Sequence, residues 1–164
     1  GAGSILALAP LTPVYAAVFA AAVADRGKSP PAVSAAPPEA CDARCALAHV
    51  AALPPARMLT MIDLGPLLIA TTPHSAYSGS YHRLQRPIAE TMRAFMSDPD
   101  LARAIVGAMG VSYVLVSPRS DESQIYRRVN PNGLAARLVA GKPPGWLRPV
   151  ETGSRALLLY RRID

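Results

Sequence analysis

Hydrophobic and polar positions follow two different periods along most of the chain. Apolar residues recur at helical spacing in 42–53, and a short apolar run follows at 57–62, which is typical of a strand buried in a sheet. The same alternation continues toward the end of the chain. We expect further helices at 66–71, 87–97, 98–110 and 130–141, strands at 74–78 and 111–117, and a closing hairpin formed by 146–151 and 155–163.

The order of these elements predicts an α/β fold. Strand, crossover and strand recur, so helices should cover a mostly parallel sheet, and the C-terminal hairpin should add an antiparallel edge. We expect one folded domain over residues 41–164, which is long enough to bury a hydrophobic core. Residues 25–40 precede it, and their prolines and small side chains are typical of an extended linker.

The first part of the chain has a different character. Residues 5–24 contain no charged side chain, and as a helix with a rise of about 1.5 Å per residue they would span roughly 30 Å, the thickness of a bilayer core. We expect residues 1–24 to form a transmembrane helix that anchors the domain. A secretory signal and a helix docked on the domain are the alternatives. An anchor or a signal would place the folded domain outside the cytoplasm.

The charge of the chain limits the kinds of molecule that it is expected to bind. The chain has 17 basic and 11 acidic residues and a net charge of +6. Its arginines are scattered, and no basic stripe is interleaved with aromatic residues, so we expect no nucleic-acid binding. A basic surface beside a membrane would favour anionic lipid head groups, although a solvated surface is the simpler interpretation. The chain has no Gly-rich phosphate loop, so no nucleotide cofactor is expected.

Motifs for metal binding and catalysis are also missing from the sequence. The two cysteines are Cys41 and Cys45, and no second Cys or His pair has the spacing of a metal site, so neither a metal nor another cofactor is expected. A disulfide between these cysteines and a pair of free, half-buried thiols are alternatives. Because there is neither a nucleophile elbow nor a pair of carboxylates, no catalytic residue is assigned.

One acidic residue still stands out. Asp63 follows the predicted strand at 57–62, at the position where α/β sheets present ligand-binding groups beyond the carboxyl end of a strand. Its carboxylate would cap the helix that begins after it, or contact a ligand or partner, or do both.

A second group of polar side chains follows within about twenty residues. His74, Tyr81, His82 and Arg83 could return to the same edge as Asp63, where Tyr and Arg would offer donors to sugar hydroxyls or phosphate. We treat all of these residues as candidate binding residues. In the alternative interpretation, Tyr81 and His82 pack beneath the loop while Arg83 pairs with Asp63.

The order of these motifs resembles that of a known family. "MLTMIDLGPLLIATTPHSAYSGSYHR", followed by "DPDLARAIVGAMGVSYVLVSP", resembles the C-terminal extracytoplasmic domain of bacterial polytopic membrane proteins related to the GT-C glycosyltransferases, which use lipid-phosphate sugars. The similarity covers roughly residues 45–120. It implies an inner-membrane protein whose folded domain lies on the periplasmic side.

The oligosaccharyltransferase catalytic subunits look like distant relatives. They carry a Trp-Trp-Asp-Tyr-Gly signature that binds the acceptor peptide. Only Asp63 and Gly65 match it here, and Met61 and Ile62 replace the Trp pair, so acceptor-peptide binding does not carry over.

The resemblance implies a function that depends on a larger protein. The catalytic acids of that superfamily lie in loops between transmembrane helices, which this chain lacks, so the chain alone should not catalyse transfer. We expect an accessory domain that shapes access of the acceptor or the lipid-linked sugar, with the rest of a membrane protein and membrane lipid as partners. The alternative is an exported or anchored binding or scaffold module, and a soluble enzyme with Asp63 and His82 in a closed pocket is a third hypothesis.

Overall fold

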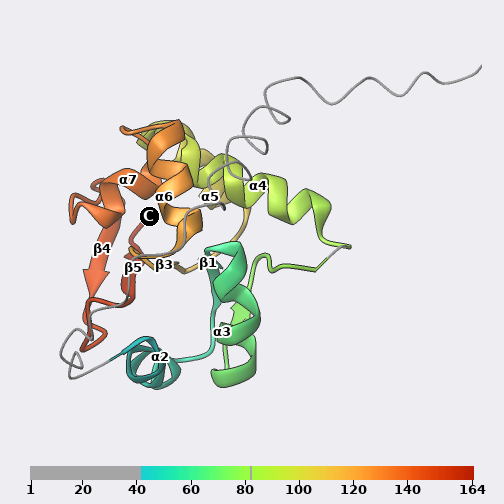
Figure 1. The fold of residues 1–164 in the computed structure, drawn as a ribbon, viewed down its shortest axis with the longest axis vertical. Coiled ribbons are helices and arrows are strands. Elements are labelled where there is room, and N and C mark those ends of the chain that lie inside the picture. The colour runs from blue at the N-terminus through green and yellow to red at the C-terminus, as the bar shows by residue number, and fades with distance from the viewer. Residues whose placement is uncertain (1–41, 82) are drawn as a thin grey trace, which may run out of the picture. The chain divides into compact units, whose positions relative to one another are not determined.

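The computed structural model describes residues 42–81 and 83–164, which belong to one compact unit. The helices and strands alternate as expected (Figure 1). In chain order the elements are α2 (Ala43–Ala51), β1 (Arg57–Thr60), the 3₁₀ turn η2 (Ile62–Leu64), α3 (Gly65–Thr71), β2 (Ser75–Ala76), α4 (Gln85–Met96), α5 (Pro99–Ala108), β3 (Tyr113–Val116), α6 (Asp121–Val129), α7 (Leu134–Val139), β4 (Leu147–Val150) and β5 (Leu158–Arg162).

The sheet is mixed, with the strand order β2-β1-β3-β5-β4. β1 pairs in parallel with both β2 and β3, whereas β5 pairs antiparallel with both β3 and β4. The α/β class and the antiparallel C-terminal pair are confirmed. The prediction of a mostly parallel sheet is wrong, because the last strand enters the sheet between β3 and β4, so half of the pairings are antiparallel.

Helices cover both faces of this sheet. In Figure 1, α2 and α3 lie on one side of the strands and α4 to α7 on the other. Right-handed crossovers explain the arrangement: the chain moves from β1 to β2 in one direction across the sheet and from β2 to β3 in the other, so the connecting helices fall on opposite faces. The central strand β3 is accordingly buried over Val114–Val116.

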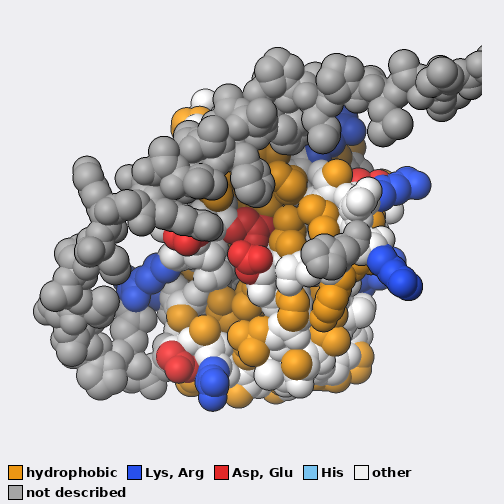
Figure 2. Space-filling view, turned by 45° about the vertical axis from the view of Figure 1, so that its right-hand side comes forward, with side chains coloured by type: hydrophobic (Ala, Val, Ile, Leu, Met, Phe, Trp, Pro, Cys, Tyr) orange, Lys and Arg blue, Asp and Glu red, His pale blue; other side chains and the backbone are white. Residues whose placement is uncertain are grey.

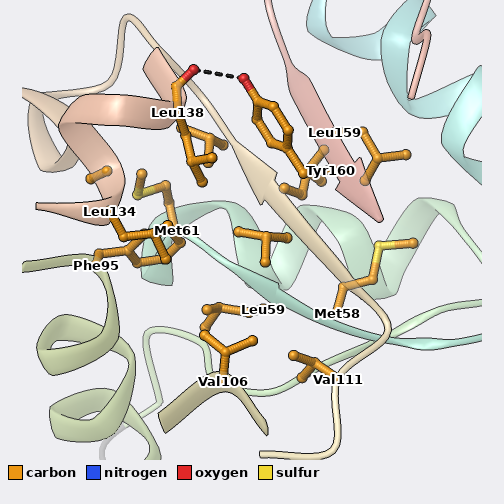
Figure 3. Close-up of a cluster of buried hydrophobic side chains, with 14 of the residues drawn as sticks. Met58, Leu59, Met61, Phe95, Val106, Val111, Leu134, Leu138, Leu159 and Tyr160 are labelled. Atoms are coloured by element: carbon orange, nitrogen blue, oxygen red, sulfur yellow. Dashed lines mark hydrogen bonds between the residues drawn. The ribbon is translucent and has the colours of Figure 1, made fainter. Parts of the chain in front are cut away.

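The main core lies between the sheet and the helices α4 to α7 (Figure 3). Phe95 of α4 stacks on Tyr126 of α6, with ring centroids 5.6 Å apart. Tyr160 of β5 donates a hydrogen bond of 2.6 Å to the Leu138 carbonyl of α7. These contacts tie the helices to one another and to the sheet.

Most helix boundaries agree with the sequence signals. Asp42 is the N-cap of α2, and its carboxylate accepts hydrogen bonds from the backbone N–H groups of Arg44 and Cys45, at 2.9 and 3.0 Å. Helix α6 was not predicted from the sequence, because its segment "DESQIYRRV" has too few apolar residues to show a helical period.

The proposed anchor and linker, residues 1–24 and 25–40, lie outside the described residues. Within 42–81 and 83–164, no helix combines the length and the hydropathy that a membrane span requires. The transmembrane, signal and docked-helix interpretations of residues 5–24 all stay predictions.

Candidate functional site

The carboxyl ends of the three parallel strands meet along one side of the sheet, which we call the carboxyl edge. It consists of the segments that follow β1, β2 and β3: residues 61–66, 77–83 and 117–122. Ligand groups in open α/β sheets gather at such an edge. Asp63, Tyr81 and Arg83, three of the five predicted binding residues, belong to these segments. His82 falls between Tyr81 and Arg83 in sequence but lies outside the described residues.

Asp63 lies in the first segment, and its side chain is exposed. It does not cap a helix. The N-cap positions of η2 and α3 are Met61 and Leu64, and neither makes a side-chain capping bond. The predicted capping role is therefore wrong, and within the described residues the Asp63 carboxylate has no hydrogen-bonded partner.

The backbone amides of Ile62 and of Asp63 itself are bound by another carboxylate, that of Glu122 on α6. Its Oε1 accepts from the backbone N–H of Ile62 at 3.0 Å, and its Oε2 accepts from the backbone N–H of Asp63 at 3.2 Å. The Tyr126 hydroxyl also donates to Oε1. Partial burial raises the pKa of the Glu122 carboxyl, and these hydrogen bonds only partly oppose that effect.

Sequence reasoning missed Glu122, although one signal was available. Ser120 caps α6 by accepting from the Ser123 N–H at 3.2 Å, so "SDES" marks a helix start directly after β3. Since β1 and β3 both lead to the carboxyl edge, the acids that follow them could have been expected to meet.

The second segment is packed tightly against α3. A Cβ atom on Gly65 would lie 2.4 Å from the Ser78 carbonyl oxygen, so only glycine fits there. The Ser78 and Thr91 hydroxyls are buried and lie 2.7 Å apart in a hydrogen bond. The loop after β2 is thus held between α3 and α4.

A polar cluster supports the same loop from α4. Tyr77 donates a hydrogen bond to Glu90, and Arg86 pairs with Glu90 at 2.9 Å. The bond from Tyr77, followed by that from Arg86, lowers the pKa of the Glu90 carboxyl, and the same contact raises the pKa of the Tyr77 hydroxyl. This cluster fixes the chain just before it reaches Tyr81.

Tyr81 and Arg83 contradict the alternative in which Tyr81 packs beneath the loop and Arg83 pairs with Asp63. The Tyr81 side chain is 50% exposed instead of packed beneath the loop. Arg83 is also exposed, and among the described residues it makes no ion pair with Asp63. Both alternatives to ligand binding are therefore wrong for this pair, which leaves its donor groups accessible. His82 lies outside the described residues.

His74 lies where the chain enters β2, at the amino ends of the parallel strands, which we call the amino edge. It precedes β2 and is only 4% exposed. Its Nε2 donates to the Val50 carbonyl at 2.8 Å, and its Nδ1 accepts from the Ala56 N–H at 3.1 Å, which requires the neutral tautomer protonated at Nε2. His74 thus ties the α2–β1 connection to β2, and the structure does not bring it together with Asp63.

The remaining predicted sites are only partly described. Cys45 is disulfide-bonded, and Cys41 lies outside the described residues, so the identity of its partner stays a prediction. Within 42–81 and 83–164, no group of three His, Cys, Asp or Glu residues could hold a metal ion. An open hollow of about 390 Å³ lies at the amino edge, between residues 110–113 and Arg161 and Arg162, away from Asp63.

Comparison with known proteins finds a solved structure with a similar fold. No family model matches the chain, and no curated protein is significantly similar to it in sequence. Among solved structures, the chain is similar to the C-terminal globular domain of an oligosaccharyltransferase from Archaeoglobus fulgidus. The TM-score is 0.52 at 10% sequence identity, over 66% of this chain and 84% of that one. The likeness is one of fold. It confirms the predicted resemblance to the oligosaccharyltransferases at that level.

Proposed function

We propose that this chain is an accessory domain of a membrane glycosyltransferase-like protein and is not catalytic alone. Its carboxyl edge, through Asp63, Tyr81 and Arg83, would contact the acceptor or the lipid-linked sugar. The domain would lie on the periplasmic side of the inner membrane, beside the membrane-embedded part that holds the reactive groups.

The observation that carries this proposal is the exposed, unpaired state of Asp63 in an otherwise well-bonded turn. Glu122 binds the first two backbone amides of the turn, and the Met61 carbonyl binds the next two, so the Asp63 carboxylate is not needed to satisfy them. Tyr81 and Arg83 are exposed on the neighbouring segment, which is fixed by Gly65 and Thr91. The similarity in fold to an oligosaccharyltransferase domain supports the choice of reaction class.

The chemistry of the three side chains suits a hydroxylated, anionic ligand. A carboxylate accepts hydrogen bonds from sugar or peptide donors, and an arginine binds a phosphate oxygen through charge-assisted bonds. A half-exposed tyrosine offers an apolar ring face together with a hydroxyl group. We assign these groups binding and no bond-making step.

The test is glycosyl transfer by the intact membrane protein. We expect Asp63→Ala and the double variant Tyr81→Phe/Arg83→Ala to raise KM at least fivefold, as loss of a hydrogen bond worth about 1 kcal/mol would require. Asp100→Ala removes an exposed carboxylate from the first turn of α5 and is the matched control. Wild-type KM and kcat in folded Asp63 and Tyr81/Arg83 variants would remove the edge from the mechanism.

A binding or scaffold module without a transferase behind it is the second candidate. The exposed side chains of Leu67 and Ile69 on α3 favour it, because they could dock on another protein. Figure 2 shows hydrophobic side chains spread over one face of the molecule, with acidic side chains among them. The gene upstream of this segment discriminates the two: many hydrophobic helices would support the transferase proposal.

A further inference from the structure

We propose that Glu122 is the positioning residue of this site: its carboxylate clamps the β1–α3 turn and thereby keeps Asp63 at the carboxyl edge in one fixed conformation. This inference rests on the proposed function of Asp63 as a ligand contact, and it adds a residue that touches no ligand itself. Glu122 acts through the backbone of Ile62 and Asp63.

The clamp consists of bonds between segments far apart in the sequence. One carboxylate bonds two successive N–H groups, with Oε1 on Ile62 at 3.0 Å and Oε2 on Asp63 at 3.2 Å. These amides are at the start of a 3₁₀ turn, where no preceding carbonyl is available to them. Without Glu122 both would be left to water, and the turn that carries Asp63 would lose these two bonds to α6.

The helix that carries Glu122 is itself rigidly held. The Tyr126 ring stacks on Phe95 of α4, and its hydroxyl donates to the Glu122 carboxylate. Ser123 donates a bond of 2.6 Å to the Ser117 carbonyl, which ties the first turn of α6 to the end of β3. A binding group is positioned well only when the groups behind it are also fixed, and Glu122 meets that condition.

The charge state of Glu122 should control the clamp. A carboxylate accepts all three hydrogen bonds, whereas protonation turns one oxygen into an O–H donor, which accepts poorly from an amide. The titratable groups that face Glu122 are Asp63 on the β1–α3 turn and Tyr126 on its own helix. The Tyr126 pKa is raised strongly, chiefly by burial, so this hydroxyl remains a donor throughout the range in which Glu122 titrates.

The first test is amide hydrogen exchange of the full 164-residue chain, followed by NMR. Glu122→Gln should accelerate exchange of the Ile62 and Asp63 amides roughly tenfold, because an amide side chain cannot accept from both. Tyr126→Phe is the matched control, since it removes only the third bond to the same carboxylate and keeps the ring. It should leave both exchange rates within about twofold of wild type.

The pH dependence of the same spectra gives a second readout. In the wild type, the Ile62 and Asp63 amide shifts should follow the titration of the Glu122 carboxyl, with a midpoint above that of an ordinary glutamate. In Glu122→Gln this transition should disappear. Unchanged exchange rates and unchanged titration in the Gln variant would overturn the positioning role, whatever the fate of the proposed function.

Transfer by the intact protein separates the two proposals. If Glu122 acts through Asp63, then Glu122→Gln raises KM, and the double variant Asp63→Ala/Glu122→Gln is no worse than Asp63→Ala alone. Additive effects would overturn the inference while leaving Asp63 as a contact. If Asp63→Ala has no effect, Asp63 is not a ligand contact and the inference that Glu122 serves one fails, even where the exchange data show the clamp; the proposed function as a whole fails only if the Tyr81/Arg83 variant is also wild type.

Discussion

Two acidic residues at the carboxyl edge have opposite environments. Asp63 is exposed and has no partner among the described residues, whereas Glu122 is partly buried and accepts three hydrogen bonds. One carboxylate is available to a ligand, and the other is used to hold the turn. The sequence placed Asp63 correctly after a strand, but it could not reveal that the Asp63 backbone amide would be bound by a side chain about sixty residues away.

Glu122 makes a testable contribution to the pH dependence of stability. Its pKa is raised in the folded state, so the folded chain binds more protons than the unfolded chain between the ordinary glutamate pKa and that raised value. The free energy of unfolding should therefore fall as pH rises through this window, relative to Glu122→Gln. Urea titrations of both proteins at several pH values measure the difference, and a constant difference would contradict the assignment.

Gly65 provides a test of the close contact between α3 and the loop after β2. A methyl group there would overlap the Ser78 carbonyl oxygen, so Gly65→Ala should reduce the free energy of unfolding by about 2 kcal/mol or more. Gly107→Ala is the control, because no atom lies within 4 Å of its added Cβ and alanine favours the α5 helix. Thermal unfolding should show the first variant less stable than wild type and the second equal or more stable.

At the scale of elements, the sequence was informative where a local pattern determines structure. The first helix, within 42–53, and the strands β1 and β3 were all predicted, because helical spacing and burial leave a local trace. Helix α6 was missed because Tyr126 is its only fully buried large side chain. The insertion of β5 between β3 and β4 depends on pairing between distant segments, which no local pattern reports.

His74 illustrates an element-scale role that the sequence could not separate from ligand binding. It lies next to β2 and bonds the backbone on both sides of the α2–β1 connection. Replacing it with Ala leaves the part-buried Ala56 N–H without its partner, opens space at a buried position and removes one of the two bonds to the Val50 carbonyl, which still accepts from the Leu53 N–H at 3.1 Å. His74→Ala should therefore reduce the free energy of unfolding by about 3 kcal/mol.

His74→Gln is the matched comparison, since its amide can both donate and accept. Chemical denaturation of the full chain should rank wild type first, the Gln variant second and the Ala variant last. A wild-type midpoint in His74→Ala would show that these two bonds do not support the α2–β1 connection. Transfer activity of the folded Gln variant should be unchanged, because His74 is at the amino edge.

At the scale of the whole molecule, the fold determines which predicted residues can act together. The parallel half of the sheet brings the segments after β1, β2 and β3 to one edge, so Asp63, Tyr81 and Arg83 belong to the same side of the domain. His74 is separated from them by the length of the strands. The shared fold with an archaeal oligosaccharyltransferase domain persists at 10% identity, because pattern and topology constrain a fold more than residue identity does.

The most direct test of the central claim is photo-crosslinking in the intact membrane protein. A photoreactive phenylalanine derivative is introduced at position 81, and separately at position 101 on α5, since Tyr81 and Leu101 are 50% and 48% exposed. If the carboxyl edge contacts the acceptor or the lipid-linked sugar, position 81 forms a crosslink to it that excess unlabelled substrate abolishes, and position 101 does not. Equal crosslinking at both positions, or none at position 81 in an active protein, would contradict the claim.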